Sequence, residues 1–325
     1  MHPSPTLHVV SGKGGTGKTT VAAALAIALA TNGKRVLLME VEGRQGIAQL
    51  FDVPPLPYEE RMVAVAPGSG EVWALAVDTE DALLDYLEMF YKMRRAGSAL
   101  KKMGAIDFAT TIAPGLRDVL LTGKAVEVVR RKDKNASNKY DYVVMDAPPT
   151  GRITHFLNVN SEVSGLAKVG PIKNHADSVM AVIASPATTV HLVTLLEEMP
   201  VQETLDGIAE LKANNLPVGQ IFVNLVRPAR FDQAQRDHAI AHTLDTQAIS
   251  ASLALVGIYS ANVTQVLEQD AADHAQRIEL EQRELARLEN SGLPVIQLPL
   301  IASGIDLGAL YQLATVIRES GVTGD

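Results

Sequence analysis

The chain has 325 residues, a formal net charge of −8 and no cysteine. A chain of this length is expected to form one large α/β domain rather than two equal ones. The acidic balance argues against a nucleic-acid partner, and the missing cysteines exclude disulfides, thiolate zinc sites and thiol-based metalloid binding. The sequence shows neither a signal-peptide pattern nor an apolar run long enough to cross a bilayer, so we expect a cytoplasmic protein.

The first predicted elements enclose a glycine-rich segment. Residues 7–10, LHVV, favour a strand, and residues 19–31, TTVAAALAIALAT, favour a helix. Between them, residues 12–19 fit the phosphate-binding pattern G-x-x-x-x-G-K-[ST], in the strand–loop–helix context that this motif requires. The alternative is a glycine-rich turn before an ordinary helix, and the complete motif in its proper context favours nucleotide binding.

Each residue type in this loop has a physical role. Glycines allow backbone N–H groups to point at phosphate oxygens, and the helix directs its positive end at the same anion. Lys18 is expected to neutralise the β- and γ-phosphates, and the Thr19 hydroxyl to join the Mg²⁺ shell. The candidate residues for binding ATP or ADP here are Gly12, Gly14, Gly15, Thr16, Gly17, Lys18, Thr19 and Thr20.

Further elements follow in the first half of the chain. Residues 34–42, KRVLLMEVE, and 71–78, EVWALAVD, predict buried strands, and the proline-rich residues 52–61 predict a loop. Residues 79–104 and 112–131 have helical patterns, the second with its start after Pro114-Gly115. We therefore predict a helical insert at 79–135 within a single domain that covers residues 1–325.

The second half continues the alternation. Residues 140–151, YDYVVMDAPPTG, predict a strand that ends at Asp146, followed by a flexible stretch to about Asp177. Strands are predicted at 178–185, 219–226 and 293–301, and helices at 188–215, 262–290 and 306–320. Pro200 is expected to break or kink the first of these helices.

Strands that alternate with helices predict a doubly wound α/β fold, with a mostly parallel sheet flanked by helices and a small helical insert. Ligands of such sheets bind at the carboxyl ends of the strands. Gly12, Glu42, Asp146 and Asn224 all fall at these ends.

The second lysine of the loop points to a family. The segment KGGTGKTT, residues 13–20, resembles the deviant phosphate loop of dimeric ATPases, which include the arsenite-pump ATPase subunit, the tail-anchored-protein targeting ATPases and the division and partition ATPases. The resemblance implies that Lys18 acts on nucleotide in its own subunit and that Lys13 reaches the phosphates of the partner. The alternative for Lys13 is a solvated loop lysine.

Other segments resemble the arsenite-pump and targeting branch, in patches from about residue 7 to 318. YDYVVMDAPPTGR resembles its D-T-A-P-T-G-H segment, which implies that Asp146 holds a Mg²⁺-bound water and that Ala147–Gly151 form a switch loop. FVNLVRP and LPLIASGIDLGAL resemble its adenine-contacting segments. They imply adenine contacts at Asn224, Pro299, Leu300 and Ile301.

The departures from the family pattern bear on catalysis. The T-D-P-A-H segment, whose aspartate orients the attacking water, aligns with residues 41–45, so Glu42 becomes the candidate for that role. Arg152 replaces a family histidine, and Ser303 replaces a late glutamate. The candidate catalytic residues are Lys13, Lys18, Glu42 and Asp146, and the candidate metal ligands are Thr19 and Asp146.

Three functions remain open from the sequence. The first is an ATP-hydrolysing dimeric switch that uses Mg²⁺ and serves a hydrophobic or membrane-protein client. The second is a catalytically weak nucleotide-binding subunit of a heterodimer with a related ATPase. The third, a division or partition ATPase, is disfavoured by the net charge and the nearly neutral C-terminal segment. Met89, Met93 and Met103 form either a client groove or core filler.

Overall fold

The chain folds around one eight-stranded sheet. The computed structural model describes residues 5–91, 115–133, 137–166, 171–258 and 261–322. The strand order is β3-β4-β2-β5-β1-β6-β7-β8, and only β3 runs antiparallel to its neighbour. The strands are β1 (Leu7–Gly12), β2 (Arg35–Glu40), β3 (Arg61–Ala66), β4 (Gly70–Ala76), β5 (Tyr142–Asp146), β6 (Thr188–Thr194), β7 (Val218–Val226) and β8 (Val295–Pro299). The predicted mostly parallel sheet is confirmed.

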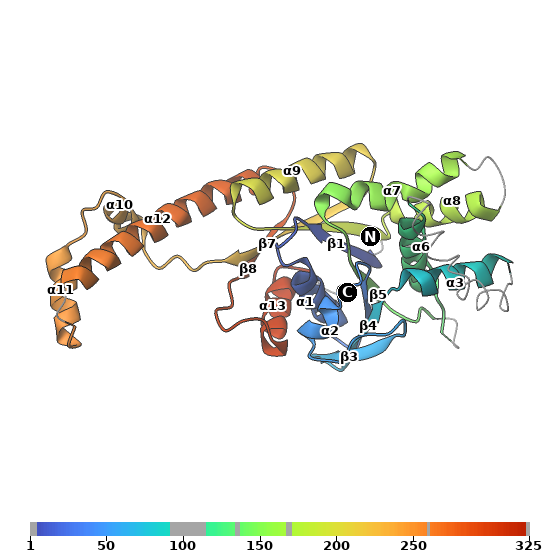
Figure 1. Ribbon diagram of the computed structural model, residues 1–325, viewed down its shortest axis with the longest axis horizontal. Coiled ribbons are helices and arrows are strands. Elements are labelled where there is room, and N and C mark those ends of the chain that lie inside the picture. The colour runs from blue at the N-terminus through green and yellow to red at the C-terminus, as the bar shows by residue number, and fades with distance from the viewer. Residues whose placement is uncertain (1–4, 92–114, 134–136, 167–170, 259–260, 323–325) are drawn as a thin grey trace.

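Helices cover both faces of this sheet (Figure 1). They are α1 (Lys18–Ala30), α2 (Gly46–Leu50), α3 (Thr79–Tyr91), α6 (Leu116–Arg130), α7 (Thr150–Leu166), α8 (Pro171–Ile183), α9 (Glu198–Ala213), α10 (Gln233–Ile240), α11 (Thr246–Leu255), α12 (Ala261–Glu289) and α13 (Leu307–Glu319). Helices α1, α2 and α13 pack on one face, and α3, α6, α7 and α9 contribute to the core on the other.

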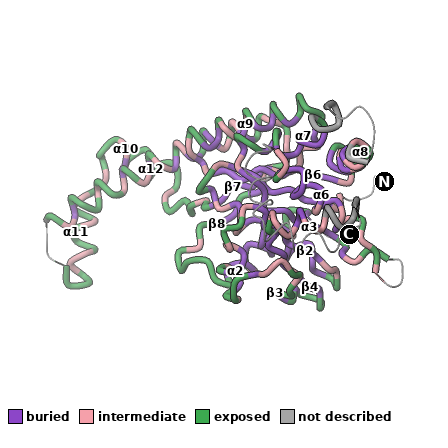
Figure 2. The backbone as a smooth tube through the Cα atoms, turned by 45° about the vertical axis from the view of Figure 1, so that its right-hand side comes forward, coloured by how far each residue is buried: buried purple, intermediate pink, exposed green. Residues whose placement is uncertain are grey.

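The alternation of side chains along the central strands divides the core into two layers. On β2, Leu37 and Met39 belong to the layer under α6 and α7, whereas Val36 and Leu38 pack against α1. Residues two apart in a strand point to the same face, and both faces here are covered, so the strand sequence is continuously apolar. Figure 2 shows the buried residues concentrated in this sheet. Most residues of α1 are buried as well.

Four segments differ from the sequence prediction. Residues 178–185 were predicted as a strand but end helix α8, with Val179, Val182 and Ile183 buried at helical spacing. The real strand is β6, whose β-branched run had been assigned to the following helix. The stretch predicted to be flexible contains α7 and the start of α8. Edge strand β3 was not predicted.

Pro200 neither breaks nor kinks α9, contrary to the prediction. The helix begins at Glu198, so Pro200 lies in its first turn. Backbone N–H groups in the first turn have no acceptor within the helix, so a proline there removes no hydrogen bond. Pro200 is buried and its carbonyl accepts a hydrogen bond from the Thr204 hydroxyl at 2.8 Å.

A helical arm projects from the sheet domain (Figure 1). It consists of α10, α11 and the distal part of α12, and the segment at 227–258 that contains α10 and α11 was not assigned from the sequence. The predicted helix at 262–290 is confirmed as α12. The end of α12 next to the sheet domain contacts it through two ion pairs. Arg277 pairs with Glu197 at 2.8 Å, and Arg227 pairs with Glu281 at 2.7 Å.

Of the predicted helical insert, the structure describes α3, α6 and short flanking segments. Helix α6 begins after Gly115, as expected. Met93 and Met103 lie outside the described residues, as does the side chain of Met89. In the described ranges, we find no helix that combines the length and the apolar character needed to cross a bilayer.

Candidate nucleotide site

The glycine-rich segment forms a loop between β1 and α1, at the carboxyl edge of the sheet. Gly12 passes so close to β6 that a Cβ there would lie 2.2 Å from the Val193 carbonyl oxygen. Gly17, with φ of 87°, would place a Cβ 2.3 Å from Nδ2 of Asn224. By contrast, a Cβ on Gly14 or Gly15 would meet no atom of the described residues within 4 Å. Two glycines are therefore required by packing, and the other two leave open space above the loop that phosphate oxygens can fill.

Lys18 is a buried cation at the start of α1, with 8 % of its surface exposed. Within the described residues its ammonium forms no ion pair with a carboxylate, although its charge lowers the pKa of Asp146. Burying an ammonium without an anion is unfavourable, so the site is electrostatically incomplete. A phosphate at the helix N-terminus would complete it.

Asp146 ends β5 beside the first turn of α1. Its Oδ2 accepts a hydrogen bond of 2.7 Å from the Thr19 hydroxyl, and its buried Oδ1 has no hydrogen-bond partner among the residues that the structure describes. Burial raises the pKa of Asp146 to about 6. The Thr19 hydrogen bond and the charge of Lys18 oppose this rise, and the charges of Glu40 and Glu42 add to it.

The free carboxylate oxygen beside a hydroxyl fits a hard cation that prefers oxygen ligands. Asp146 and Thr19 are thus suited to hold Mg²⁺, which neutralises phosphate charge when bound.

The loop after β2 carries Glu42 and is held by a residue that sequence reasoning missed. Glu40 is 2 % exposed, and its carboxylate accepts hydrogen bonds from the backbone N–H groups of Gln45 and Ile47. Glu40 lies in register with Asp146 on the neighbouring strand. A second support comes from the insert, where Arg117 donates to the Val41 carbonyl at 3.2 Å. A charged residue at the end of an apolar strand is the sequence signal that could have identified Glu40.

Glu42 itself is partly exposed. Its side chain is 20 % accessible and lies 3.6 Å from the guanidinium of Arg44. Its charge raises the pKa of Asp146, so the two carboxylates share one site. The structure therefore brings together Lys18, Thr19, Asp146 and Glu42, which come from three different segments.

Lys13 lies on the outer side of the loop, where its ammonium is 3.1 Å from Oε2 of Glu203 on α9. The other oxygen of this carboxylate, Oε1, accepts a 2.5 Å hydrogen bond from the Thr150 hydroxyl. Lys13 is about one-third exposed. Glu203 was not singled out from the sequence, because only the tertiary fold brings α9 to the loop.

The residues predicted to contact adenine lie at the ends of β7 and β8. Asn224 is 5 % exposed, and its Nδ2 donates to the Thr16 carbonyl at 2.9 Å, so its amide supports the phosphate loop. Pro299 ends β8, and Leu300 donates its N–H to the Val226 carbonyl at 2.9 Å. Ile301 packs against the core beneath α1 and α13. Their contact with adenine stays a prediction.

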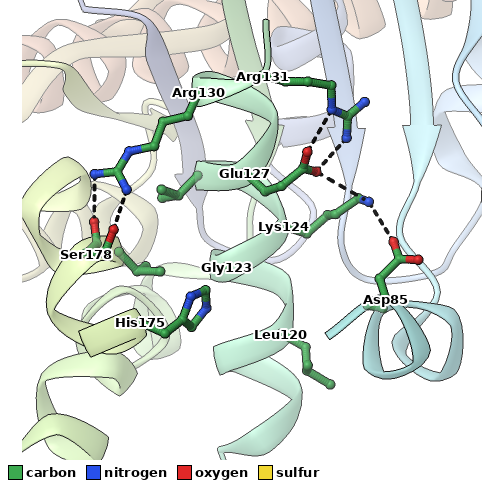
Figure 3. A pocket seen from close by; sticks show the side chains of 12 residues that line it. Asp85, Leu120, Gly123, Lys124, Glu127, Arg130, Arg131, His175 and Ser178 are labelled. Carbon is green, nitrogen blue, oxygen red and sulfur yellow. Dashed lines mark hydrogen bonds and ion pairs between the residues drawn. The ribbon is translucent and has the colours of Figure 1, made fainter. Parts of the chain in front are cut away.

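A separate cavity of about 620 Å³ opens in the insert region. Figure 3 shows it between α3, α6 and α8. Lys124 on α6 contacts Asp85 at 2.8 Å on one side, and Arg130 binds the Ser178 carbonyl at 3.0 Å on the other. Gly123 leaves room for the His175 ring, since a Cβ there would lie 3.1 Å from its Nε2. The cavity has charged walls and apolar residues such as Leu120 and Val179 in its lining.

Replacing Glu40 with glutamine tests the support of the Glu42 loop. In this variant an amide nitrogen would replace one of the two carboxylate oxygens that now accept hydrogen bonds from the backbone N–H groups of Gln45 and Ile47. One buried N–H would then lose its acceptor, at a cost of about 1–3 kcal/mol in the free energy of unfolding. We expect a lower melting temperature and a lower kcat for ATP with little change in the affinity for ADP. Glu59→Gln, at an exposed position in the loop before β3, is the control. Unchanged stability and kcat would contradict the role of Glu40.

A glycine-rich loop, a buried lysine with no ion pair in the described part of the chain, and an adjacent threonine–aspartate pair define a nucleotide-binding site of the P-loop class. Comparison with known proteins agrees. The model of the family described as anion-transporting ATPase matches residues 6–186, more than half of the chain.

Individual proteins are also similar. The ATPase BagA of Mycobacterium tuberculosis is 49 % identical over 97 % of this chain and 93 % of its own length. The ATPase GET3 of Kluyveromyces lactis is 26 % identical over 69 % of this chain and 73 % of its own. An arsenical pump-driving ATPase of Escherichia coli is 27 % identical over 69 % of this chain and 40 % of its own. The chain belongs to the anion-transporting ATPase family, and the resemblance to this family is confirmed.

Proposed function

We propose that this chain hydrolyses ATP with Mg²⁺ as a dimer in which each subunit completes the site of the other. The observation that carries the proposal is the buried Lys18, whose charge acts on Asp146; among the described residues, Lys18 forms no ion pair and Oδ1 of Asp146 has no hydrogen-bond partner. A nucleotide phosphate and a metal ion are the two charges that this arrangement lacks. Membership of an ATPase family supports the same reaction.

Each residue has a defined task in the proposed reaction. Lys18 and the loop N–H groups bind the phosphates, while Thr19 and Asp146 hold the metal ion. Glu42 orients the attacking water, and Lys13 enters from the partner subunit to offset charge on the γ-phosphoryl group. Catalysis by positioning tolerates only small errors in geometry. This is why the buried anchor of the Glu42 loop at Glu40 matters to the proposal.

A hydrophobic or membrane-protein client is proposed for the helical insert. The apolar residues lining the cavity between α3, α6 and α8 support this, as does the link from α6 to the nucleotide edge through Arg117. Absence of thiols argues against arsenite as the ligand, since metalloid binding by cysteine is impossible in this chain.

A second candidate is a weak subunit that binds nucleotide and depends on a related ATPase for turnover. It is favoured by Glu42, which stands where family members have a shorter carboxylate. The two functions differ in what Glu42→Asp does to steady-state hydrolysis.

For the self-sufficient ATPase we expect Glu42→Asp to lower kcat by roughly tenfold, and Glu42→Gln by roughly a hundredfold, with KM nearly unchanged. Colorimetric phosphate release with purified chain measures this. Arg44→Ala controls for loss of the neighbouring ion pair. A rise in kcat on shortening to aspartate would overturn the first function and favour the weak subunit.

A further inference from the structure

One carboxylate joins the phosphate loop to the segment that follows Asp146. Glu203 uses both oxygens, Oε2 for Lys13 at 3.1 Å and Oε1 for the Thr150 hydroxyl at 2.5 Å. Neither connection is local, because Glu203 comes from α9, Lys13 from the loop after β1 and Thr150 from the start of α7. The same group therefore contacts two segments that border the nucleotide.

The packing of α9 fixes this carboxylate in place. Gly207, one turn further along the helix, would place a Cβ 3.2 Å from Cγ2 of Thr150, so the helix and Thr150 are in close contact. Thr150 is only 2 % exposed, and Val201 and Leu211 of α9 are fully buried. Glu203 thus sits on a rigid support. The flexible partner in the ion pair is the Lys13 side chain.

In this single chain, the cation proposed to act on the partner's nucleotide is already neutralised by its own subunit. Lys13 must give up or share this ion pair before its full charge can act on another subunit's phosphates. We propose that Glu203 is a positioning residue that holds Lys13 back in the separate subunit and releases it when a nucleotide-bound dimer forms. The inference rests on the proposed dimeric ATPase.

Thr150 is the residue that would couple nucleotide binding to the release of Lys13. It lies at the end of the segment Ala147–Gly151, which begins directly after the Mg²⁺-binding candidate Asp146. Movement of this segment towards a γ-phosphate would shift Thr150 and thereby loosen the carboxylate that it orients. Nucleotide binding and exposure of Lys13 would then be coupled through one side chain, which biases the equilibrium between separate and paired subunits.

The expected size of the change in dimerisation follows from the solvent exposure of the Lys13–Glu203 ion pair. Both side chains are about one-third exposed, so the ion pair is partly screened by solvent. Pairs of this kind shift an equilibrium by about two- to fivefold. Two subunits must each release one lysine, so removing the negative charge should raise the dimerisation constant by about four- to twenty-five-fold.

The test is sedimentation velocity with Mg²⁺ and a non-hydrolysable ATP analogue. Glu203→Gln removes the charge but keeps an oxygen for the Thr150 hydroxyl. It should dimerise at lower protein concentration than wild type, with half-saturating ATP for hydrolysis lowered and kcat unchanged. Glu210→Gln is the matched control, because it makes the same change at an exposed position of the same helix, and should behave as wild type. Thr150→Val, which removes the hydroxyl alone, should give a smaller shift in the same direction.

Combining Glu203→Gln with Lys13→Gln distinguishes a failure of the Glu203 proposal from a failure of the proposed dimeric ATPase. Lys13→Gln alone should weaken dimerisation and turnover, and adding Glu203→Gln to it should cause no further change. If Lys13→Gln has no effect, the proposed role of Lys13 between subunits fails. If Lys13→Gln is defective but Glu203→Gln lowers kcat or leaves dimerisation unchanged, the holding role of Glu203 fails while the dimeric ATPase stands.

Discussion

Lys18→Ala is expected to remove Mg²⁺-ATP binding while leaving the nucleotide-free protein at least as stable as wild type. Lys18 is buried and has no ion-pair partner among the described residues, so its deletion removes an uncompensated charge from the folded state. In the complex the same ammonium is expected to face the phosphates, and truncating one partner of a buried charge pair costs roughly 2–5 kcal/mol of binding free energy, which is about 30-fold or more in affinity.

Thermal unfolding with and without Mg²⁺-ATP measures both parts of this prediction. Wild type should show a nucleotide-dependent rise in melting temperature. The variant should show none, from an unchanged or higher baseline. Lys212→Ala, at an exposed position on α9, should retain the full nucleotide effect. A nucleotide-dependent rise preserved in Lys18→Ala would contradict the assignment of the phosphate site.

Acidification is expected to destabilise the protein through a buried histidine pair, His8 on β1 and His191 on the neighbouring strand β6. The Gln220 N–H donates to Nδ1 of His191 at 3.2 Å, so His191 carries its proton on Nε2 and donates it to Nδ1 of His8 at 3.0 Å. His8 then donates from Nε2 to the Pro5 carbonyl at 3.2 Å. Both rings are neutral in this chain of hydrogen bonds, and a further proton would set two donors against each other.

Burial lowers the pKa of His8 from 6.5 to about 4. Burial also lowers the pKa of His191 well below its usual value, and the charge of His8 adds to this effect. Between these values the unfolded chain binds more protons than the folded one, so stability present above pH 6.5 is lost as the pH falls towards 4. For His8 alone the loss is about 3 kcal/mol. Asp146, with its pKa raised to about 6, acts in the opposite direction over part of this window.

The difference between wild type and His8→Gln isolates the histidine contribution from that of Asp146. Glutamine can accept from His191 and donate to Pro5 without titrating. Urea unfolding at pH 7 and pH 4.5 should show the stability gap between the two proteins moving by about 2 kcal/mol in favour of the variant on acidification. His242→Asn, at an exposed histidine, should follow wild type. A gap independent of pH would contradict the neutral pair.

The sequence predicted well where the glycine-rich loop and the end of β5 lie, because motif and topology agree there. A complete phosphate-loop pattern between a strand and a helix fixes the positions of Gly12 to Thr19, and an apolar strand that ends in Asp146 belongs beside it. The prediction failed between residues 151 and 200, where short apolar runs fit either strand or helix. The segment at 178–185 shows the ambiguity, since its spacing buries one helical face while its composition suits a strand.

The residues that support the phosphate loop and the Glu42 loop could not be predicted from a local motif. Glu203 depends on α9 reaching the loop after β1, and Arg117 depends on the insert touching the segment after β2. Such contacts connect residues that are 190 and 76 positions apart, and no local pattern encodes them. The role of Glu40 could in principle have been predicted from the sequence, because a carboxylate at the end of an apolar strand needs hydrogen bonds to be buried.

The central claim, that each subunit supplies Lys13 to the nucleotide held by Lys18 of the other, is tested most directly by mixing two inactive variants. Lys13→Ala keeps a site that can bind nucleotide, and Lys18→Ala keeps a lysine that can be donated. If the lysine acts between subunits, an equimolar mixture should recover about one quarter of wild-type hydrolysis, because half of the dimers are mixed and each has one complete site. If the mixture stays as inactive as either variant alone while mixed dimers form, Lys13 acts within its own subunit and the claim is wrong.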